Sequence, residues 1–327
     1  MGFKALFIGL VMLALLLGGA GLVIGQSPSG RLHSLATIAG SGPYSFPGKA
    51  AMDRYGNIYL LDPVLSNIFV VNAAKPGSEP RALCSPRTPS TASDISIAGG
   101  GIWILGDHGS KAVRLDHSCH VQSSFGTQRP GLSLQANSAG EVIVLTGAGA
   151  ALFDVYDQNG KLLRSFGERL SYGNPIADTV LSEGRIVSDR MGGFYFSFDY
   201  PPLVRHYGRD GKLLGEFKPA SDIYIGPPNI TSQQAGGRLT VRPNYQVLVL
   251  DLTLDDRGRL IFLLSGKSKS QAVSEGSQNL LVTNGAGKVL RKIIIEDTFF
   301  HRLVAGNGAL YLLRNRDGLR LDKYALP

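Results

Sequence analysis

Three residues of the sequence, Asp251, His301 and Ser188, have the side chains of a hydrolytic triad: a carboxylate, an imidazole and a hydroxyl. A serine becomes a nucleophile when a histidine takes its proton and a carboxylate orients that histidine. The three residues come from separate segments, and their spacing does not fix the distances between them. The residue types therefore allow a hydrolase, and the fold has to decide whether the triad exists.

A second cluster, His117, Cys119 and His120, places three metal-ligating side chains close together in the chain. Structural zinc sites use four ligands, usually as two spaced pairs, and no partner pair occurs elsewhere in the sequence. We therefore do not predict a zinc site from this cluster.

A repeated unit must position all of these residues. Each of six copies has a short apolar strand, a turn with Asp or Asn and Gly, a second hydrophobic strand, a polar turn and a further strand. The third copy adds a fourth strand after the hairpin turn Asn159-Gly160. The turn glycines recur at intervals of about 40 to 65 residues and are Gly56, Gly101, Gly140, Gly193, Gly258 and Gly308.

This repeat predicts an all-β fold, a six-bladed β-propeller of four-stranded antiparallel blades over residues 33–327. A single blade cannot cover its own faces, so neighbouring blades must stack. The last copy has only three strands, whereas His33–Ala39 is a spare strand near the N-terminus. We expect this strand to pair with the last blade as its outermost strand and so remove the open edge.

The repeats resemble NHL repeats. Pro47–Asp62 reads Pro-Gly-x-Ala-x-x-Asp-x-x-Gly-Asn-Ile-Tyr-x-x-Asp, and Asp157–Gly167 reads Asp-x-x-Gly-Lys-x-x-x-x-Phe-Gly. The resemblance covers about residues 33–327 and implies a six-bladed propeller. It implies no single activity, because this fold hosts binding modules, lactone hydrolases, lyases and quinone dehydrogenases.

The resemblance also raises the alternative of a metal-dependent enzyme of lactone-hydrolase or lyase type, with its site in the central channel. The lactone hydrolases of the family hold calcium or zinc with inward carboxylates and amides. In this sequence Asn137 and Asp251 match such positions, and no Glu lies on a clear innermost strand. This departure favours a protein without a metal cofactor and without enzymatic activity.

The N-terminal segment 1–25 has the pattern of an export signal. Lys4 is its only charge, and an apolar core is followed by small residues, with a cleavage point before Gln26. An uncleaved membrane anchor is the alternative, because residues 5–25 are long enough to span a bilayer. We expect residues 26–32 to form a linker and the propeller to lie outside the cytoplasm, secreted or periplasmic, with membrane contact only through residues 5–25.

The composition excludes some other classes. The chain has 327 residues, 43% of them hydrophobic and only 18% charged, which excludes a charge-solvated disordered protein. The formal net charge is +8, but the basic residues are scattered. Together with the export signal, this scatter argues against nucleic acid as a partner.

Long insertions indicate where a partner binds. The segments Glu168–Arg185, Lys218–Gln246 and Ser265–Gln278 all fall on one face of the predicted ring, and long connections in compact folds are usually functional or disordered. The aromatic and arginine side chains in these insertions suit a contact surface and are Tyr172, Tyr224, Arg238, Arg242 and Tyr245. We therefore expect a monomeric binding or scaffold module for a protein, peptide or glycan.

The two cysteines, Cys84 and Cys119, form a single disulfide by default in an oxidising compartment. The strand assignment argues against this pairing. It places Cys84 at the end of an outermost strand and Cys119 in a turn between the third and fourth strands of the next blade, on opposite faces of the ring.

Overall fold

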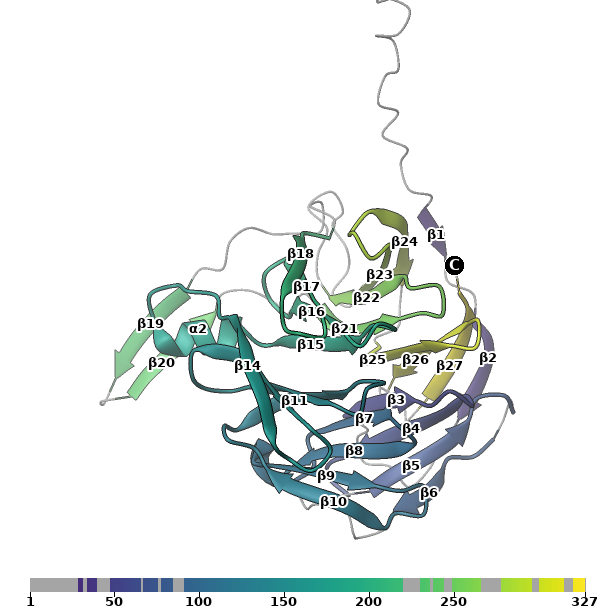
Figure 1. Ribbon diagram of the computed structural model, residues 1–327. Coiled ribbons are helices and arrows are strands. Elements are labelled where there is room, and N and C mark those ends of the chain that lie inside the picture. The colour runs from purple at the N-terminus through teal and green to yellow at the C-terminus, as the bar shows by residue number, and fades with distance from the viewer. Residues whose placement is uncertain are drawn as a thin grey trace, which may run out of the picture.

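The computed structural model describes twelve stretches of the chain: residues 29–31, 34–39, 48–65, 67–75, 78–84, 91–219, 230–235, 238–243, 249–265, 278–295, 300–314 and 320–326. Within them, six sheets, each with four antiparallel strands, surround a central channel (Figure 1). The prediction of an all-β, six-bladed propeller is therefore confirmed.

Each blade is ordered from the channel outward. The first three blades are β3 (Lys49–Met52), β4 (Asn57–Asp62), β5 (Asn67–Asn72) and β6 (Arg81–Cys84); β7 (Asp94–Ala98), β8 (Gly101–Gly106), β9 (Lys111–Leu115) and β10 (Val121–Gly126); and β11 (Gly131–Ala136), β12 (Val142–Thr146), β13 (Ala151–Tyr156) and β14 (Leu162–Glu168). The other three are β15 (Gly184–Ser188), β16 (Phe194–Phe198), β17 (Val204–Tyr207) and β18 (Leu213–Phe217); β21 (Val249–Leu254), β22 (Leu260–Ser265), β23 (Gln278–Thr283) and β24 (Val289–Ile295); and β25 (Arg302–Gly306), β26 (Ala309–Arg314) and β27 (Arg320–Ala325) with β2 (Ser34–Ala39).

The hydrophobic core lies between the blades. Six buried clusters of side chains each join two neighbouring blades, so every blade interface is filled. One cluster packs Ile58 and Leu60 of the first blade against Tyr311 and Leu313 of the last and so closes the ring. The second strand of each blade is a short apolar run that is almost entirely buried, as stacking of the blades requires. These strands are β4, β8, β12, β16, β22 and β26.

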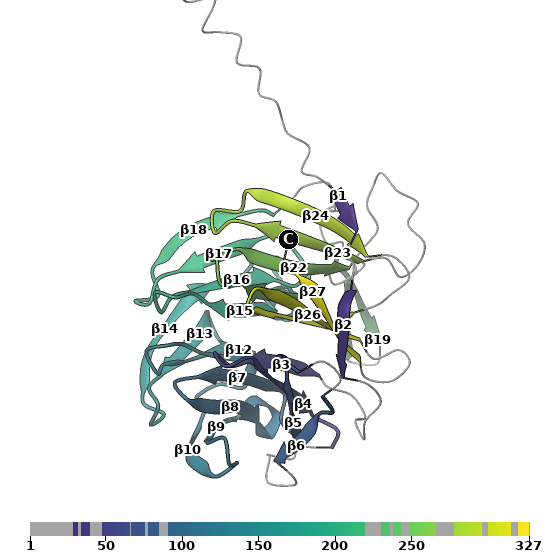
Figure 2. The same cartoon turned by 90° about the vertical axis from the view of Figure 1, so that its right-hand side faces the viewer.

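The N-terminal strands lie along the outer edges of the last two blades (Figure 2). Strand β2 pairs antiparallel with β27, from Ser34 opposite Tyr324 to Ala39 opposite Leu321. The hydroxyl of Thr37 donates to a carboxylate oxygen of Asp322 at 2.8 Å. Strand β1 (Ser29–Arg31) adds a parallel fifth strand beside β24. These contacts place β2 at the outermost position of the last blade.

The repeated Asp and Asn residues close the turns between strands. One side-chain oxygen of Asp53 accepts hydrogen bonds from the backbone N–H groups two and four residues further on, and equivalent bonds occur at Asn137, Asp189 and Asp255. This is the turn role that their repetition indicates. Two of the six predicted turn glycines are not the left-handed residues of their turns. Gly192 rather than Gly193 has a positive φ, because the left-handed residue follows Asp189 by three positions, and in the second blade Gly99 and Gly100 rather than Gly101 have a positive φ.

Cys84 and Cys119 form a disulfide, with their Cα atoms 5.7 Å apart. The argument from opposite faces is wrong because it treats the blades as flat. Strand β6 has four residues, and its last residue, Cys84, lies in the buried cluster between the first two blades. The turn after β9 carries Cys119 into the same cluster. The bond thus links the outer part of one blade to the next.

Two elements interrupt the regular blades. Helix α2 (Pro175–Leu181) lies between β14 and β15, and the hairpin β19 (Ile230–Ala235) and β20 (Arg238–Pro243) lies between β18 and β21. Figure 1 shows this hairpin outside the ring of blades. Over the stretches of chain that the structure describes, no helix has the length and apolar character needed to cross a membrane. The predicted export segment, residues 1–25, lies outside those stretches.

Candidate functional site

The innermost strands all begin at the same face of the ring. Each is followed by strands of alternating direction, so connections between blades and loops between second and third strands open on this face. It carries α2, the β19–β20 hairpin and one mouth of the channel. We call it the insertion face.

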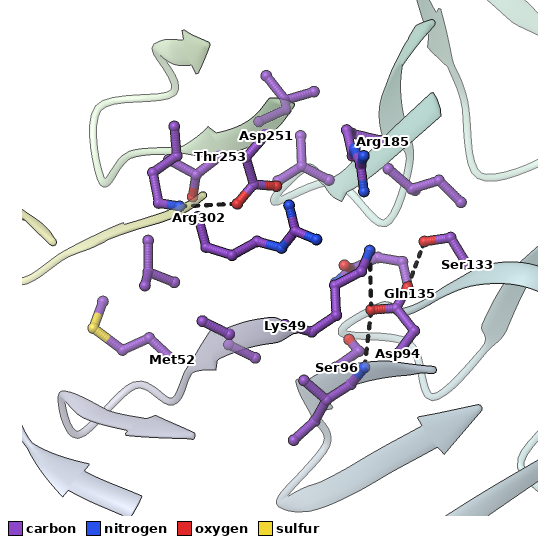
Figure 3. Close-up of a pocket in the computed structure, with 18 of the residues that line it drawn as sticks. Lys49, Met52, Asp94, Ser96, Ser133, Gln135, Arg185, Asp251, Thr253 and Arg302 are labelled. Atoms are coloured by element: carbon purple, nitrogen blue, oxygen red, sulfur yellow. Dashed lines mark hydrogen bonds and ion pairs between the residues drawn. The ribbon is translucent and has the colours of Figure 1, made fainter. Parts of the chain in front are cut away.

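The central channel contains a cavity of about 210 Å³, lined by residues along all six innermost strands. The end of this cavity on the insertion face is the channel mouth. The residues at or near the starts of these strands are polar or charged, and Figure 3 shows them around one space. Going round the ring from the first blade to the last, they are Lys49, Asp94, Ser133, Arg185, Asp251 and Arg302.

Asp94 joins three blades. Its carboxylate accepts hydrogen bonds from the Ser133 hydroxyl and, at 2.9 Å, from the backbone N–H of Leu134, both in the third blade. Its other oxygen lies 3.5 Å from the Lys49 ammonium of the first blade and accepts the N–H of Ile95. The Asp94 carboxylate is therefore fully used by the protein, and its role is to hold the strands together.

The last two blades are joined in the same way to the first. Asp251 accepts the backbone N–H of Leu303 at 2.9 Å. The Arg302 guanidinium donates to the carbonyl oxygen of Gly48 at 2.6 Å and to that of Leu250 at 3.2 Å. Arg302 therefore bridges the fifth, sixth and first blades at the point where the ring closes.

Arg185 is neutralised locally. It forms two hydrogen bonds to the carboxylate of Asp199, at 3.0 and 2.9 Å, which is the bidentate geometry of a strong charge-assisted pair. Although burial opposes it, Asp199 holds the pKa of Arg185 above its ordinary value. The Lys49 ammonium is different: burial lowers its pKa, Arg185 and Arg302 lower it further, and Asp94 opposes them.

A second cavity on the insertion face lies beside α2. It has a volume of about 520 Å³ and lies between the inserted segment and the loop after β12. Arg169 fixes this arrangement, because its guanidinium donates to the carbonyl oxygens of Thr146, Ala148 and Gly149. The cavity wall is therefore held by side-chain hydrogen bonds rather than by strand pairing.

The structure places the predicted contact residues as follows. Tyr172 lies in the inserted segment before α2, is 39% exposed, and its backbone N–H donates to Asp178. Arg238 and Arg242 lie on β20. Tyr224 and Tyr245 fall outside the described residues.

The two metal candidates are at opposite ends of the innermost strands. Asn137 directly follows the end of β11, where its side chain donates to Glu141 at 2.9 Å and to the carbonyl of Gly192 at 3.1 Å. Asp251 lies at the channel mouth. The structure therefore does not bring them together, and its described part contains no group of three or more His, Cys, Asp or Glu side chains suited to hold a metal ion.

The hydrolytic triad is not assembled either. Ser188 ends β15, at the far end from the insertion face, and its hydroxyl donates to the carbonyl of Ala136 at 3.2 Å. His301 and Asp251 lie near the start of their strands, and burial lowers the pKa of His301, with Arg302 adding to the effect. A serine at one end of the channel and an imidazole at the other cannot exchange a proton directly.

Sequence reasoning missed Lys49, Asp94, Arg185 and Arg302. Each lies within two residues of the start of an innermost strand, a position that a sequence pattern locates only to within a few residues. A usable signal was present: each is the single charge of a short innermost strand, at or next to its first residue, and the strand leads into one of the repeated turns.

Comparison with known proteins supports the fold. No protein-family model matches the sequence, and a search of curated proteins finds no match. Three similar solved structures have low sequence identity but extensive coverage. A member of the DUF4221 family from Bacteroides vulgatus has a TM-score of 0.60 and 10% identity, over 90% of this chain and 97% of that chain.

The other two are virginiamycin B lyase from Staphylococcus aureus, with a TM-score of 0.53 and 11% identity over 91% of this chain and 99% of that chain, and the β-propeller domain of Cps50 (Swd1) from Myceliophteria thermophila, with a TM-score of 0.52 and 10% identity over 91% of this chain and 100% of that chain. At such identity these likenesses show a shared propeller fold. One relative is a lyase and another is not described as an enzyme, so the fold alone does not determine an activity.

Proposed function

We propose that the protein is a binding propeller that holds a protein, peptide or glycan partner on its insertion face. The observation that carries this proposal is the cavity of about 520 Å³ between the inserted segment and the loop after β12. Because a plain propeller connection needs only a few residues, a segment that builds its own helix and cavity wall indicates a surface with a use beyond closing the blade.

The chemistry of this surface fits a partner with polar and aromatic groups. Tyr172 is exposed and directly follows Ser171 of the cavity wall, and tyrosine contributes large contact area at low entropy cost. Arg169 holds three carbonyl groups in place, so the wall does not have to be ordered when the partner binds. In this proposal Arg238, Arg242, Tyr224 and Tyr245 extend the same surface.

The proposal includes export of the chain by residues 1–25 and action outside the cytoplasm. The disulfide between Cys84 and Cys119 supports it, because disulfides persist mainly in oxidising compartments. The NHL-like repeats fit the same proposal, since propellers of this kind serve as contact surfaces.

Site-specific photo-cross-linking tests the proposal. Benzoylphenylalanine replaces Tyr172, and in a matched control it replaces Tyr55, which is 67% exposed in the β3–β4 turn on the opposite face. In the organism that makes the protein, we expect a discrete adduct from position 172 and none from position 55. The Thr179→Arg variant, which places a bulky cation in the cavity wall, should weaken the adduct.

Equal adducts from both positions would contradict the assignment of the insertion face. Absence of any adduct from positions 172, 224 and 245 would contradict the binding function itself.

A further inference from the structure

We propose that the channel mouth binds the carboxylate group of a small polar acid between Lys49 and Arg302. This inference goes beyond the partner surface proposed above, because it concerns a different cavity and a different class of ligand. The proposal starts from the order of charges around the channel. From the first blade to the last, the signs are positive, negative, neutral, positive, negative and positive.

The ring closes on two cations. The charges alternate in sign from Lys49 to Asp94, and again from Arg185 through Asp251 to Arg302. The last blade lies beside the first, so two cations, Arg302 and Lys49, are neighbours at this junction. Arg302 reaches across this junction to the Gly48 carbonyl, next to Lys49. Figure 3 shows the Lys49, Arg185 and Arg302 side chains pointing toward the same space. An anion at this junction would complete the alternation.

Both cations have unused hydrogen-bond donors. Among the residues that the structure describes, the Lys49 ammonium has one charged partner, Asp94, at 3.5 Å, longer than the usual 2.7–2.9 Å of a charge-assisted bond. Arg302 uses its Nε and Nη1 atoms for backbone carbonyls, which leaves Nη2 without a partner in the described part of the chain. A carboxylate can accept from both side chains at once.

Two other charges of the ring, Arg185 and Asp94, are already satisfied. Arg185 is held by both oxygens of Asp199, and Asp94 accepts from Ile95, Ser133 and Leu134. The donors left over thus belong to the two cations at the junction. Burial, with Arg185 and Arg302 adding to it, lowers the pKa of Lys49 and so disfavours its charged form. A bound anion would favour that charged form, which gives the ligand a favourable electrostatic contribution.

The fifth blade, which lies beside the last one, offers an acceptor for a second group on the ligand. Asp251 uses one carboxylate oxygen for the Leu303 N–H, and the other has no hydrogen bond within the described residues. A hydroxyl or ammonium group on the ligand would donate to it. The cavity volume of about 210 Å³ leaves room for a small organic acid. The ligand class is therefore a short hydroxy acid or amino acid.

Isothermal titration calorimetry on the mature protein tests this inference with matched pairs of probes at constant ionic strength. Glycolate is compared with glycolamide, which has the same shape and no charge, and glycine with glycinamide. We expect the wild-type protein to bind glycolate or glycine at least tenfold more tightly than the corresponding amide. This comparison uses only wild-type protein, so it stands whether or not a variant folds.

Variants then locate the site. Lys49→Met should weaken binding of the acid at least tenfold, whereas the exposed Lys161→Met is the matched control and should leave it unchanged. Lys49→Arg should retain most of the binding. Equal affinity for acid and amide, no binding of either acid at 50-fold molar excess over 1 mM protein, or unchanged binding in a folded Lys49→Met protein would overturn the proposal.

Discussion

Replacing Asp94 by alanine should destabilise the ring more than any other single change at the channel mouth. The Asp94 carboxylate is buried and accepts bonds from the third blade while facing Lys49 of the first. Without it, the Leu134 N–H loses its partner inside the protein, which costs about 1–3 kcal/mol. Breaking a buried ion pair from one side costs about 3–5 kcal/mol, and Lys49 recovers part of this because it faces the channel.

We therefore expect Asp94→Ala to lower the free energy of unfolding by about 3–5 kcal/mol. Equilibrium unfolding in urea measures this, with the fluorescence of Trp103 as the signal; it is the single tryptophan of the chain and is 2% exposed. The control is Asp210→Ala, in an exposed turn, which should cost less than about 1 kcal/mol.

A double-mutant cycle with Lys49→Met separates the ion pair from the backbone bond. Removing Lys49 as well as Asp94 takes away the unpaired charge, so the double variant should be more stable than the sum of the single effects predicts, by about 1–2 kcal/mol. A cost of Asp94→Ala below 1 kcal/mol would refute the inter-blade role of this carboxylate. A double variant whose loss equals the sum of the two single losses would refute the coupling to Lys49.

Two further predictions concern the disulfide and the Lys49 ammonium. Replacing Cys84 and Cys119 together by alanine should lower the free energy of unfolding by about 3–4 kcal/mol, from the entropy of a loop closed over 35 residues, and unfolding of wild type with and without reductant should show the same difference. Burial lowers the folded-state pKa of Lys49 below the ordinary pKa of a lysine side chain. As the pH rises from the folded-state pKa to the higher pKa of the unfolded chain, the unfolded chain binds more protons and stability rises with pH. Subtracting the Lys49→Met unfolding profile from that of wild type should show this rise; a flat difference would contradict the lowered pKa.

The fold could be predicted from the sequence because its determinants are local and repeated. Apolar runs such as Phe194–Phe198 are buried strands, and aspartates such as Asp53 and Asp255 close the turns between them. Each copy supports the reading of the others, so errors of one or two residues at a strand end do not change the number of blades.

The disulfide could not be decided in the same way. Its outcome depends on how neighbouring blades pack against each other, and that packing brings the end of a four-residue strand, at Cys84, against a turn of the next blade. Strand order alone assigns residues to one rim or the other of the ring. It does not say how far a side chain near the rim reaches into the interface between blades.

The candidate site could not be predicted from the sequence for a related reason. Lys49, Asp94, Arg185 and Arg302 are single charges separated by long stretches of sequence, and no spacing between them is regular. They meet because every innermost strand begins at the same face. A residue-by-residue search therefore finds ordinary solvated charges, whereas the fold converts them into one ring.

Because the six blades supply different residues, the ring of side chains favours one orientation of a bound ligand. If all six blades supplied the same residue, a small ligand could bind in six equivalent orientations. Here the third blade supplies the Ser133 hydroxyl, and the last and first supply adjacent cations, with Asp251 facing the channel from the fifth. An acid whose carboxylate lies between Lys49 and Arg302 can direct its second polar group to Asp251 in only one orientation. The departures from repeat symmetry are thus what makes the channel mouth able to select a ligand.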